Sequence, residues 1–221
     1  MIVEFLGAPG AGKSTLTGEV LDELRRRGVR ATSVAGHNRD GEDLDRRWRP
    51  TRLLVRTARL VATPRLTLSS LSRLDGRAAG LELMRLQRRE AFRRQLDEPD
   101  GVLLLDEGPL HKVTMMVTTG RVRRALALAD VVSEPDLCVA LDVDVETARD
   151  RIRSRPPTCN LDFADDATIE RYVARYLVAY EQVMARMSCR ILRVDACSKE
   201  AVSRIVSDIA EEGVPPCTSR T

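Results

Sequence analysis

The chain has 221 residues, of which 43% are apolar and 31% are charged, and its formal net charge is +3. That length suits one α/β domain with a substantial core, or one domain with a small additional lobe. Acidic and basic residues are mixed along the chain, and one Trp, three Tyr and three Phe are too few for a base-stacking platform. We therefore expect no nucleic-acid partner.

The five cysteines contain no C-x-x-C spacing, which argues against a structural zinc site and favours a reduced, cytoplasmic setting. No apolar run approaches the roughly 20 residues that a membrane-spanning helix needs. The N-terminus has no basic segment ahead of a long apolar stretch, so the sequence predicts no signal peptide. We expect a cytoplasmic protein without a membrane partner.

The first predicted strand, 2–6, leads directly into the octapeptide GAPGAGKS at 7–14, and a helix-forming segment follows at 15–27. This is the G-x-x-x-x-G-K-S pattern of a phosphate-binding loop (P-loop), in its expected strand–turn–helix context. Free backbone N–H groups and the helix dipole both point into such a turn. Lys13 is expected to contact the outer phosphates and Ser14 to bind Mg²⁺. The residues predicted to line the nucleotide phosphates are Gly7, Ala8, Pro9, Gly10, Ala11, Gly12, Lys13, Ser14 and Thr15.

A second predicted strand, 31–35, precedes a polar turn and a long segment without a readable motif. In the turn, His37 is a candidate substrate residue or a plain polar loop residue, and Asp40 is a candidate substrate residue and general base. The segment 41–98 is too long for a single crossover, and prolines divide it into helical stretches. We expect a substrate-binding lobe there; the alternative is a helical insertion that only covers the sheet edge.

The third predicted strand, 102–106, ends on Asp106, and Glu107 follows it. Phosphoryl transfer needs one carboxylate to hold Mg²⁺, and a second can accept the proton of the attacking hydroxyl. We assign Asp106 to the metal and Glu107 to the base; the alternative is that both acids cap the following helix. His111, just after this turn, is a candidate substrate residue or an ordinary polar one.

The fourth predicted strand, 137–142, leads into an arginine-rich helix that ends at Pro156-Pro157. On a helix, Arg149 and Arg153 are i,i+4 neighbours, and so are Arg151 and Arg155. Two cationic pairs repel each other unless an anion lies between or beside them. We therefore predict a phosphate-closing lid over 149–166, in which planar guanidinium groups contact the transferring phosphoryl group. The alternative is an exposed arginine face.

A fifth strand is predicted at 190–194, a closing helix at 199–212 and a flexible tail at 213–221. The apolar strands lack alternation, as central parallel strands covered on both faces do. The order predicts a three-layer α/β/α fold around a five-stranded parallel sheet, in one domain spanning 1–212. Ligands should bind at the carboxyl ends of the strands.

These motifs resemble the P-loop nucleoside-monophosphate kinase group, and thymidylate kinase most closely. The likeness covers the loop at 7–14, the segment 141–155, the helix around 171–180 and the turn 194–196, which is most of the chain outside 41–98. The resemblance places Arg151, Arg153 and Arg155 on basic lid positions, and Asp195 and Ala196 beside the adenine ring of ATP. It also implies that a homodimer can form.

The chain departs from that family at its acceptor side. Thymidylate kinases usually have an Asp-Arg pair after strand three, where this chain has Asp106 and Glu107. They also have an Arg-Glu-Pro-Gly turn after strand two, where this chain has GHNRD at 36–40. A carboxylate in place of the arginine suits a neutral hydroxyl acceptor better than a phosphate, although Arg39 offers a partial substitute.

The sequence thus predicts an ATP- and Mg²⁺-dependent kinase of a small molecule, either a nucleoside, a sugar or a natural-product alcohol. Its chemistry would rest on Lys13, Asp106 and Glu107, with Arg153 and Arg155 over the γ-phosphoryl group. The alternatives are a thymidylate or other nucleoside-monophosphate kinase, and a regulatory nucleotide-binding ATPase.

Overall fold

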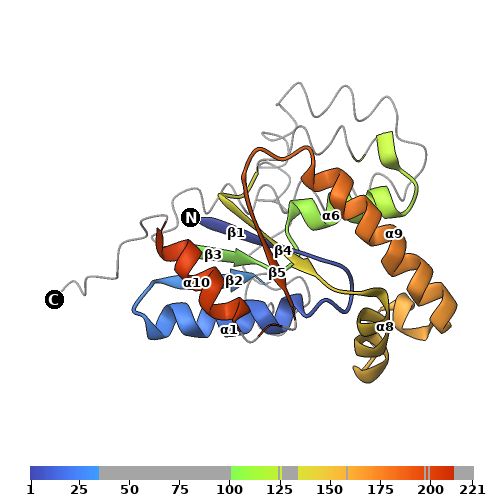
Figure 1. Ribbon diagram of the computed structural model, residues 1–221, viewed down its shortest axis with the longest axis horizontal. Coiled ribbons are helices and arrows are strands. Elements are labelled where there is room, and N and C mark those ends of the chain that lie inside the picture. The colour runs from blue at the N-terminus through green and yellow to red at the C-terminus, as the bar shows by residue number, and fades with distance from the viewer. Residues whose placement is uncertain are drawn as a thin grey trace, which may run out of the picture.

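The computed structural model describes residues 1–34, 101–123, 125, 134–157, 159–196, 198 and 200–211. Five parallel strands form one sheet in the order β2-β3-β1-β4-β5 (Figure 1). Their bounds are Ile2–Leu6 (β1), Ala31–Val34 (β2), Val102–Leu105 (β3), Leu137–Asp142 (β4) and Arg190–Asp195 (β5). The strands therefore fall where the sequence predicts them, within one residue at each end.

The two faces of the sheet are covered by different helices (Figure 1). Helices α1 (Lys13–Arg26) and α10 (Ala201–Glu211) lie on one face, and α6 (Pro109–Thr118) and α9 (Asp166–Met184) on the other. Every residue of β1 and of β3 is buried, and apart from Glu4 in β1 all of them are apolar, as expected of central parallel strands. The predicted three-layer α/β/α fold is confirmed.

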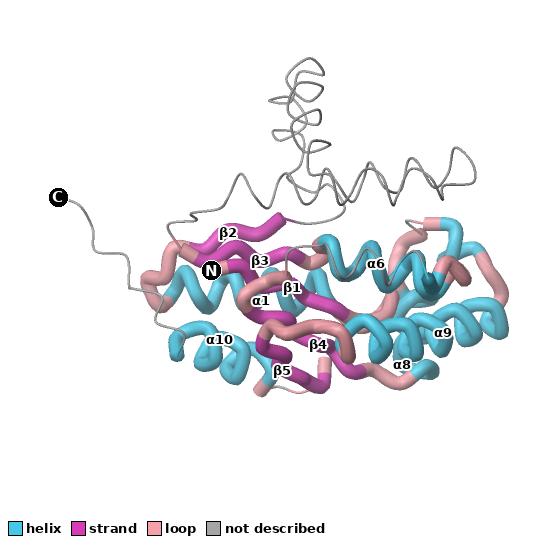
Figure 2. Tube along the Cα trace, turned by 90° about the horizontal axis from the view of Figure 1, so that it is seen from above, coloured by secondary structure: helices cyan, strands magenta, loops and turns pink. Residues whose placement is uncertain are grey.

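Helix α8 (Val145–Ser154) follows β4 and lies beside α9, beyond the end of the sheet (Figure 2). Asp144 caps α8 by accepting from the Thr147 N–H at 2.8 Å, and Asp165 caps α9 by accepting from the Thr168 N–H at 2.7 Å. Both caps satisfy N–H groups that a helix start leaves unpaired. Helix α8 ends before Pro156-Pro157, as the sequence predicts, and a short 3₁₀ helix, η1 (Asn160–Phe163), connects it to α9.

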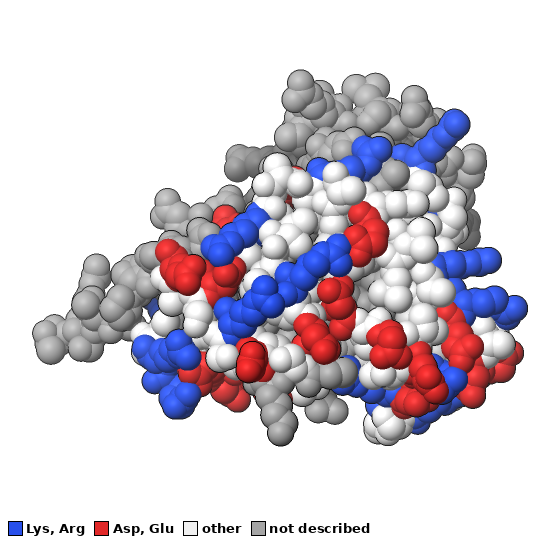
Figure 3. Space-filling view, in the orientation of Figure 1, with Lys and Arg blue, Asp and Glu red and all other residues white. Residues whose placement is uncertain are grey.

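Several predicted features lie outside the described residues. They are the lobe at 41–98, the residues His37, Arg39 and Asp40, and the tail at 213–221. Among the helices that the structure describes, none has the length and apolar character to cross a membrane. On the face seen in Figure 3, basic and acidic side chains lie next to one another, in keeping with the small net charge.

Candidate active site

The turn between β1 and α1 has the backbone geometry of an anion cradle. Gly10 and Gly12 have φ of 82° and 89°, in the left-handed region that favours glycine. The Ala11 N–H closes the turn on the carbonyl of Ala8 at 3.0 Å. A Cβ at position 10 would overlap the backbone carbonyl of Ala148 in α8, so α8, the helix that leads into the predicted lid, packs directly against this turn.

The Lys13 ammonium lies inside the cradle. Its Nζ donates to the carbonyls of Gly7 at 2.7 Å and Ala8 at 3.1 Å. Burial lowers the pKa of Lys13 to about 8, an effect that the nearby carboxylates of Glu107 and Asp106 oppose and the Arg155 guanidinium reinforces. A group that loses water in this way interacts strongly with an incoming anion, because the surrounding dielectric is low.

Ser14 and Asp106 are brought together although they are 92 residues apart. The Ser14 Oγ donates to an Asp106 carboxylate oxygen at 2.8 Å. Asp106 directly follows β3 and is 4% exposed, whereas Ser14 is exposed in the first turn of α1. Mg²⁺ takes one or two protein oxygens and fills its octahedron with water and phosphate oxygens, so this hydroxyl–carboxylate pair fits it. Among the described residues no group of three His, Cys, Asp or Glu side chains that could hold a metal ion occurs.

Glu107 lies at the same edge, one residue beyond Asp106. Its carboxylate is close enough to Lys13 to raise the pKa of that ammonium, and its side chain is half-buried. Helix α6 begins two residues later at Pro109, with Gly108 as its N-cap residue. The structure therefore brings Lys13, Ser14, Asp106 and Glu107 together, as the sequence predicts.

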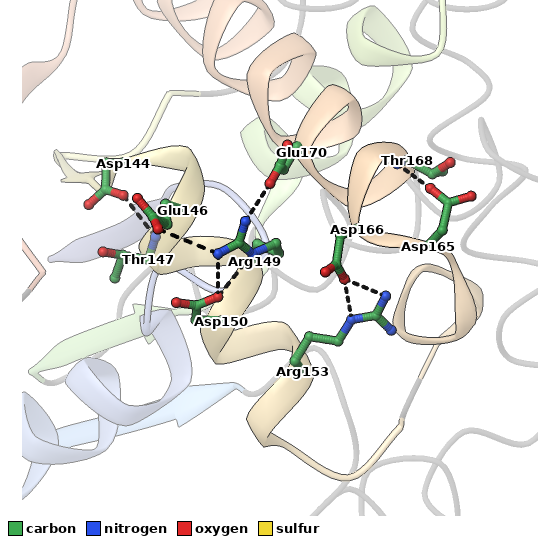
Figure 4. Close-up of polar contacts among 10 residues, drawn as sticks. All are labelled: Asp144, Glu146, Thr147, Arg149, Asp150, Arg153, Asp165, Asp166, Thr168 and Glu170. Atoms are coloured by element: carbon green, nitrogen blue, oxygen red, sulfur yellow. Dashed lines mark hydrogen bonds and ion pairs between the residues drawn. The ribbon is translucent and has the colours of Figure 1, made fainter.

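The lid arginines divide by helix face, and one face is turned to α9 (Figure 4). Arg149 pairs with Glu170 of α9 at 2.5 Å and with Asp150 at 2.8 Å. Arg153 pairs with Asp166, the first residue of α9, at 2.6 Å. The carboxylates of Glu170 and Asp166 thus offset the repulsion between the neighbouring cations Arg149 and Arg153. Arg153 joins the lid to α9 in this arrangement, and its predicted contact with the γ-phosphoryl group remains a prediction.

The other face of α8 is turned to the P-loop. An Arg151 guanidinium nitrogen lies 3.4 Å from the carbonyl oxygens of Gly10 and Ala11. Arg155 follows α8 and is close enough to influence Lys13, while its guanidinium donates to the Asp162 carboxylate at 2.8 Å. Arg151 and Arg155 are therefore the lid arginines nearest the predicted phosphate site.

His111 and the predicted adenine turn occupy different parts of the structure. His111 lies in the first turn of α6, is 6% exposed, and its Nδ1 is 2.8 Å from the Tyr176 hydroxyl of α9. Asp195 ends β5 and pairs in register with Asp142 of β4. The Ala196 N–H lies 3.4 Å from the Asp142 carbonyl, which keeps this turn at the carboxyl edge of the sheet.

Sequence reasoning missed three polar residues around the site: Glu4, Asp162 and Tyr176. Glu4 is 1% exposed in the middle of β1, and its carboxylate accepts from the His111 N–H at 3.0 Å. The Asp162 carboxylate accepts from Arg155 and from the Cys159 N–H, both at 2.8 Å. A signal for Glu4 was present, since an acid within an apolar strand needs a buried partner.

Comparison with solved structures gives the same fold. No protein-family model and no curated relative matches the chain. Deoxyadenosine kinase from M. mycoides with bound dATP superposes with a TM-score of 0.58 at 16% identity, covering 95% of this chain and 100% of that one. The same kinase with the products dCMP and a flexible dCDP gives 0.57 at 18% identity, covering 96% and 100%. Its dCTP complex gives 0.52 at 17% identity, with the same coverage.

Proposed function

We propose that this chain is an ATP-dependent phosphotransferase that moves the γ-phosphoryl group to a hydroxyl of a small molecule. The observation that carries the proposal is the Ser14–Asp106 contact of 2.8 Å beside the P-loop lysine. It joins a nucleotide cradle to a carboxylate at the carboxyl edge of a parallel sheet, where α/β enzymes bind their ligands. The fold shared with deoxyadenosine kinase supports the same class of reaction.

The residues divide the work as follows. The Lys13 ammonium neutralises phosphate oxygens, and the backbone amides of the cradle orient them. Ser14 and Asp106 would hold Mg²⁺, which when bound offsets phosphate charge. Glu107 orients the acceptor hydroxyl and accepts its proton, with Asp40 as the competing base. Arg151 and Arg155 add positive charge from the lid, and Arg153 is predicted to join them.

Two features bear on the acceptor. Glu107 stands where thymidylate kinases usually have an arginine, which favours an uncharged hydroxyl over a phosphate. The solved neighbour is named a deoxyadenosine kinase, and its complexes hold dATP, dCTP, dCMP and dCDP. We therefore place deoxynucleosides first among the acceptors, ahead of sugars and natural-product alcohols. A cytoplasmic location and a homodimer are further expectations of this proposal.

The test is a panel of acceptors with Mg²⁺ and ATP, in which ADP release and the phosphorylated product are both measured. Transfer to a nucleoside, sugar or alcohol supports the proposal, and Lys13→Met is the control that should abolish it. Strong turnover of thymidine monophosphate with none of a nucleoside would replace it with a thymidylate kinase. ATP hydrolysis that only a protein partner stimulates would replace it with a regulatory ATPase.

A further inference from the structure

We propose that Glu4, a buried carboxylate in the central strand, is a positioning residue that holds the turn carrying Asp106 and Glu107. The inference rests on the proposed function only for the roles of those two acids. The contacts that place Glu4 against the turn stand independently of it.

The position of Glu4 is unusual for an acid. It lies in β1, opposite Leu105 of β3 on one side and Cys138 of β4 on the other, and it is 1% exposed. Removing a carboxylate from water is costly unless hydrogen bonds and favourable charge replace the lost solvation. A side chain that served only to fill the core would be apolar here, as its strand neighbours Val3 and Phe5 are. The carboxyl group therefore requires a specific hydrogen-bond partner.

That partner is the start of α6. The Glu4 Oε1 accepts from the His111 backbone N–H at 3.0 Å. The helix begins at Pro109, and its N-cap residue, Gly108, has no side chain that could accept from the first-turn amides. Glu4 in the neighbouring strand β1 therefore provides the hydrogen-bond acceptor that the side chain of a Ser or Asp N-cap residue usually provides. The positive end of the helix dipole further favours an anion at this place.

Gly108 leaves the space that the Glu4 carboxylate occupies. A Cβ at position 108 would overlap the Glu4 carboxyl carbon and both of its oxygens. The φ of Gly108 is −80°, so the backbone angle does not demand glycine, and the close approach of the carboxylate does. The acid in β1 and the glycine in the turn thus form one packing unit.

The contacts of Glu4 hold the turn that carries Asp106 and Glu107 at both of its ends. Leu105, just before the turn, is held in register beside Glu4 in the sheet. His111, just after it, is held by the Glu4 carboxylate through its backbone and by the Tyr176 hydroxyl through its ring. Asp106, Glu107 and Gly108 lie between these anchors. Loss of Glu4 should let the turn move, and Asp106 would then leave Ser14 without the P-loop itself being altered.

The experiment compares Glu4→Met, which removes the hydrogen-bond acceptor at a similar side-chain size, with Gly108→Ala and with Thr114→Val as a matched control. Thr114 is a fully buried polar residue of α6, and its hydroxyl donates to the Leu110 carbonyl away from the turn. For each folded variant, kcat, the KM for ATP and the Mg²⁺ concentration for half-maximal activity are measured. We expect Glu4→Met to lower kcat about 10- to 100-fold and to raise the Mg²⁺ requirement, with the KM for ATP within about threefold. Thr114→Val should leave all three values within about twofold.

A double-mutant cycle adds a readout that general destabilisation does not produce. Gly108→Ala should be severe in the wild-type background and mild in Glu4→Ala, because the overlap then disappears. Additive effects would overturn the proposal, as would a Glu4→Met variant with wild-type kcat and Mg²⁺ dependence. If Glu4 variants do not fold, amide exchange on the wild-type chain decides: a protected His111 N–H supports the contact, and rapid exchange there overturns it.

The outcome is separable from that of the proposed function. If no acceptor is phosphorylated, the same variants are compared by calorimetry for Mg²⁺-dependent binding of ATP. A smaller gain in ATP affinity on adding Mg²⁺ in Glu4→Met than in Thr114→Val supports the positioning role even then. Equal Mg²⁺ dependence in the two variants overturns it.

Discussion

The Lys13 ammonium gives the sharpest quantitative test of the site, through the protons it exchanges when a nucleotide binds. Burial lowers its pKa from 10.5 to about 8. At pH 8, about half of the unliganded molecules therefore carry a neutral Lys13, whereas at pH 7 only about one in ten does. A triphosphate in the cradle replaces the lost solvation with negative charge and raises the pKa again.

The sign of the effect follows from these values. Unliganded folded protein binds fewer protons at Lys13 than the nucleotide complex, so binding must take up protons. We expect an uptake of about 0.5 proton per nucleotide at pH 8 and about 0.1 at pH 7. The apparent dissociation constant should rise about twofold at pH 8 and about tenfold at pH 9, relative to its value well below pH 8.

Titration calorimetry in buffers of different ionisation enthalpy measures this uptake directly. Lys13→Met, which keeps the length of the side chain without the charge, is the control and should show none at pH 8. Proton uptake near zero at pH 8 in the wild-type chain would refute the assignment of a desolvated ammonium to the cradle. The same uptake in both proteins would assign the proton to another group.

Three further predictions test separate parts of the site. Asp106→Asn keeps a hydrogen-bond acceptor for Ser14 but removes the charge, so the Mg²⁺ requirement of the reaction should rise about 10- to 100-fold, measured by metal titration. Gly10→Ala strains a residue with φ of 82° and overlaps the Ala148 carbonyl, so ATP affinity should fall at least about tenfold in calorimetry; unchanged affinity would contradict the packing of α8 on the P-loop. Tyr176→Phe removes the hydroxyl that contacts the buried His111 ring and should lower the free energy of unfolding by about 1–3 kcal/mol in urea; a neutral effect would show that this bond has no stabilising role.

The fold was predictable because its signals are local. Apolar runs such as 102–105 mark buried parallel strands, and the octapeptide at 7–14 fixes a strand before it and a helix after it. The site was partly predictable for a related reason. Parallel strands all end at one edge, so an acid directly after a strand must lie near a P-loop that follows another strand. This argument singles out Asp106, and the structure places its carboxylate 2.8 Å from the Ser14 hydroxyl, while its role as a metal ligand stays a prediction.

The missed residues act through contacts that no local pattern encodes. Glu4 accepts from an amide 107 positions away, and Tyr176 contacts a histidine 65 positions away. Periodicity places Tyr176 on a buried helix face but says nothing about its hydroxyl partner. Glu4 interrupts an apolar strand, so the sequence shows that it needs compensation without showing where that compensation lies.

The arginines of α8 contact different partners on two faces of the helix. Arg149 and Arg153 share a face of α8 and pair with Glu170 and Asp166, whose negative charges offset theirs. Arg151, two residues after Arg149, lies on another face of α8, where its guanidinium contacts the P-loop carbonyls. The sequence grouped Arg149 with Arg153 correctly, whereas Arg155 lies just beyond the end of α8 in extended conformation and is not a helical i,i+4 partner of Arg151. Helix geometry alone could not say which arginines face the P-loop. The acids of α9 decide it, because they attract Arg149 and Arg153 and leave Arg151 turned to the Gly10 and Ala11 carbonyls.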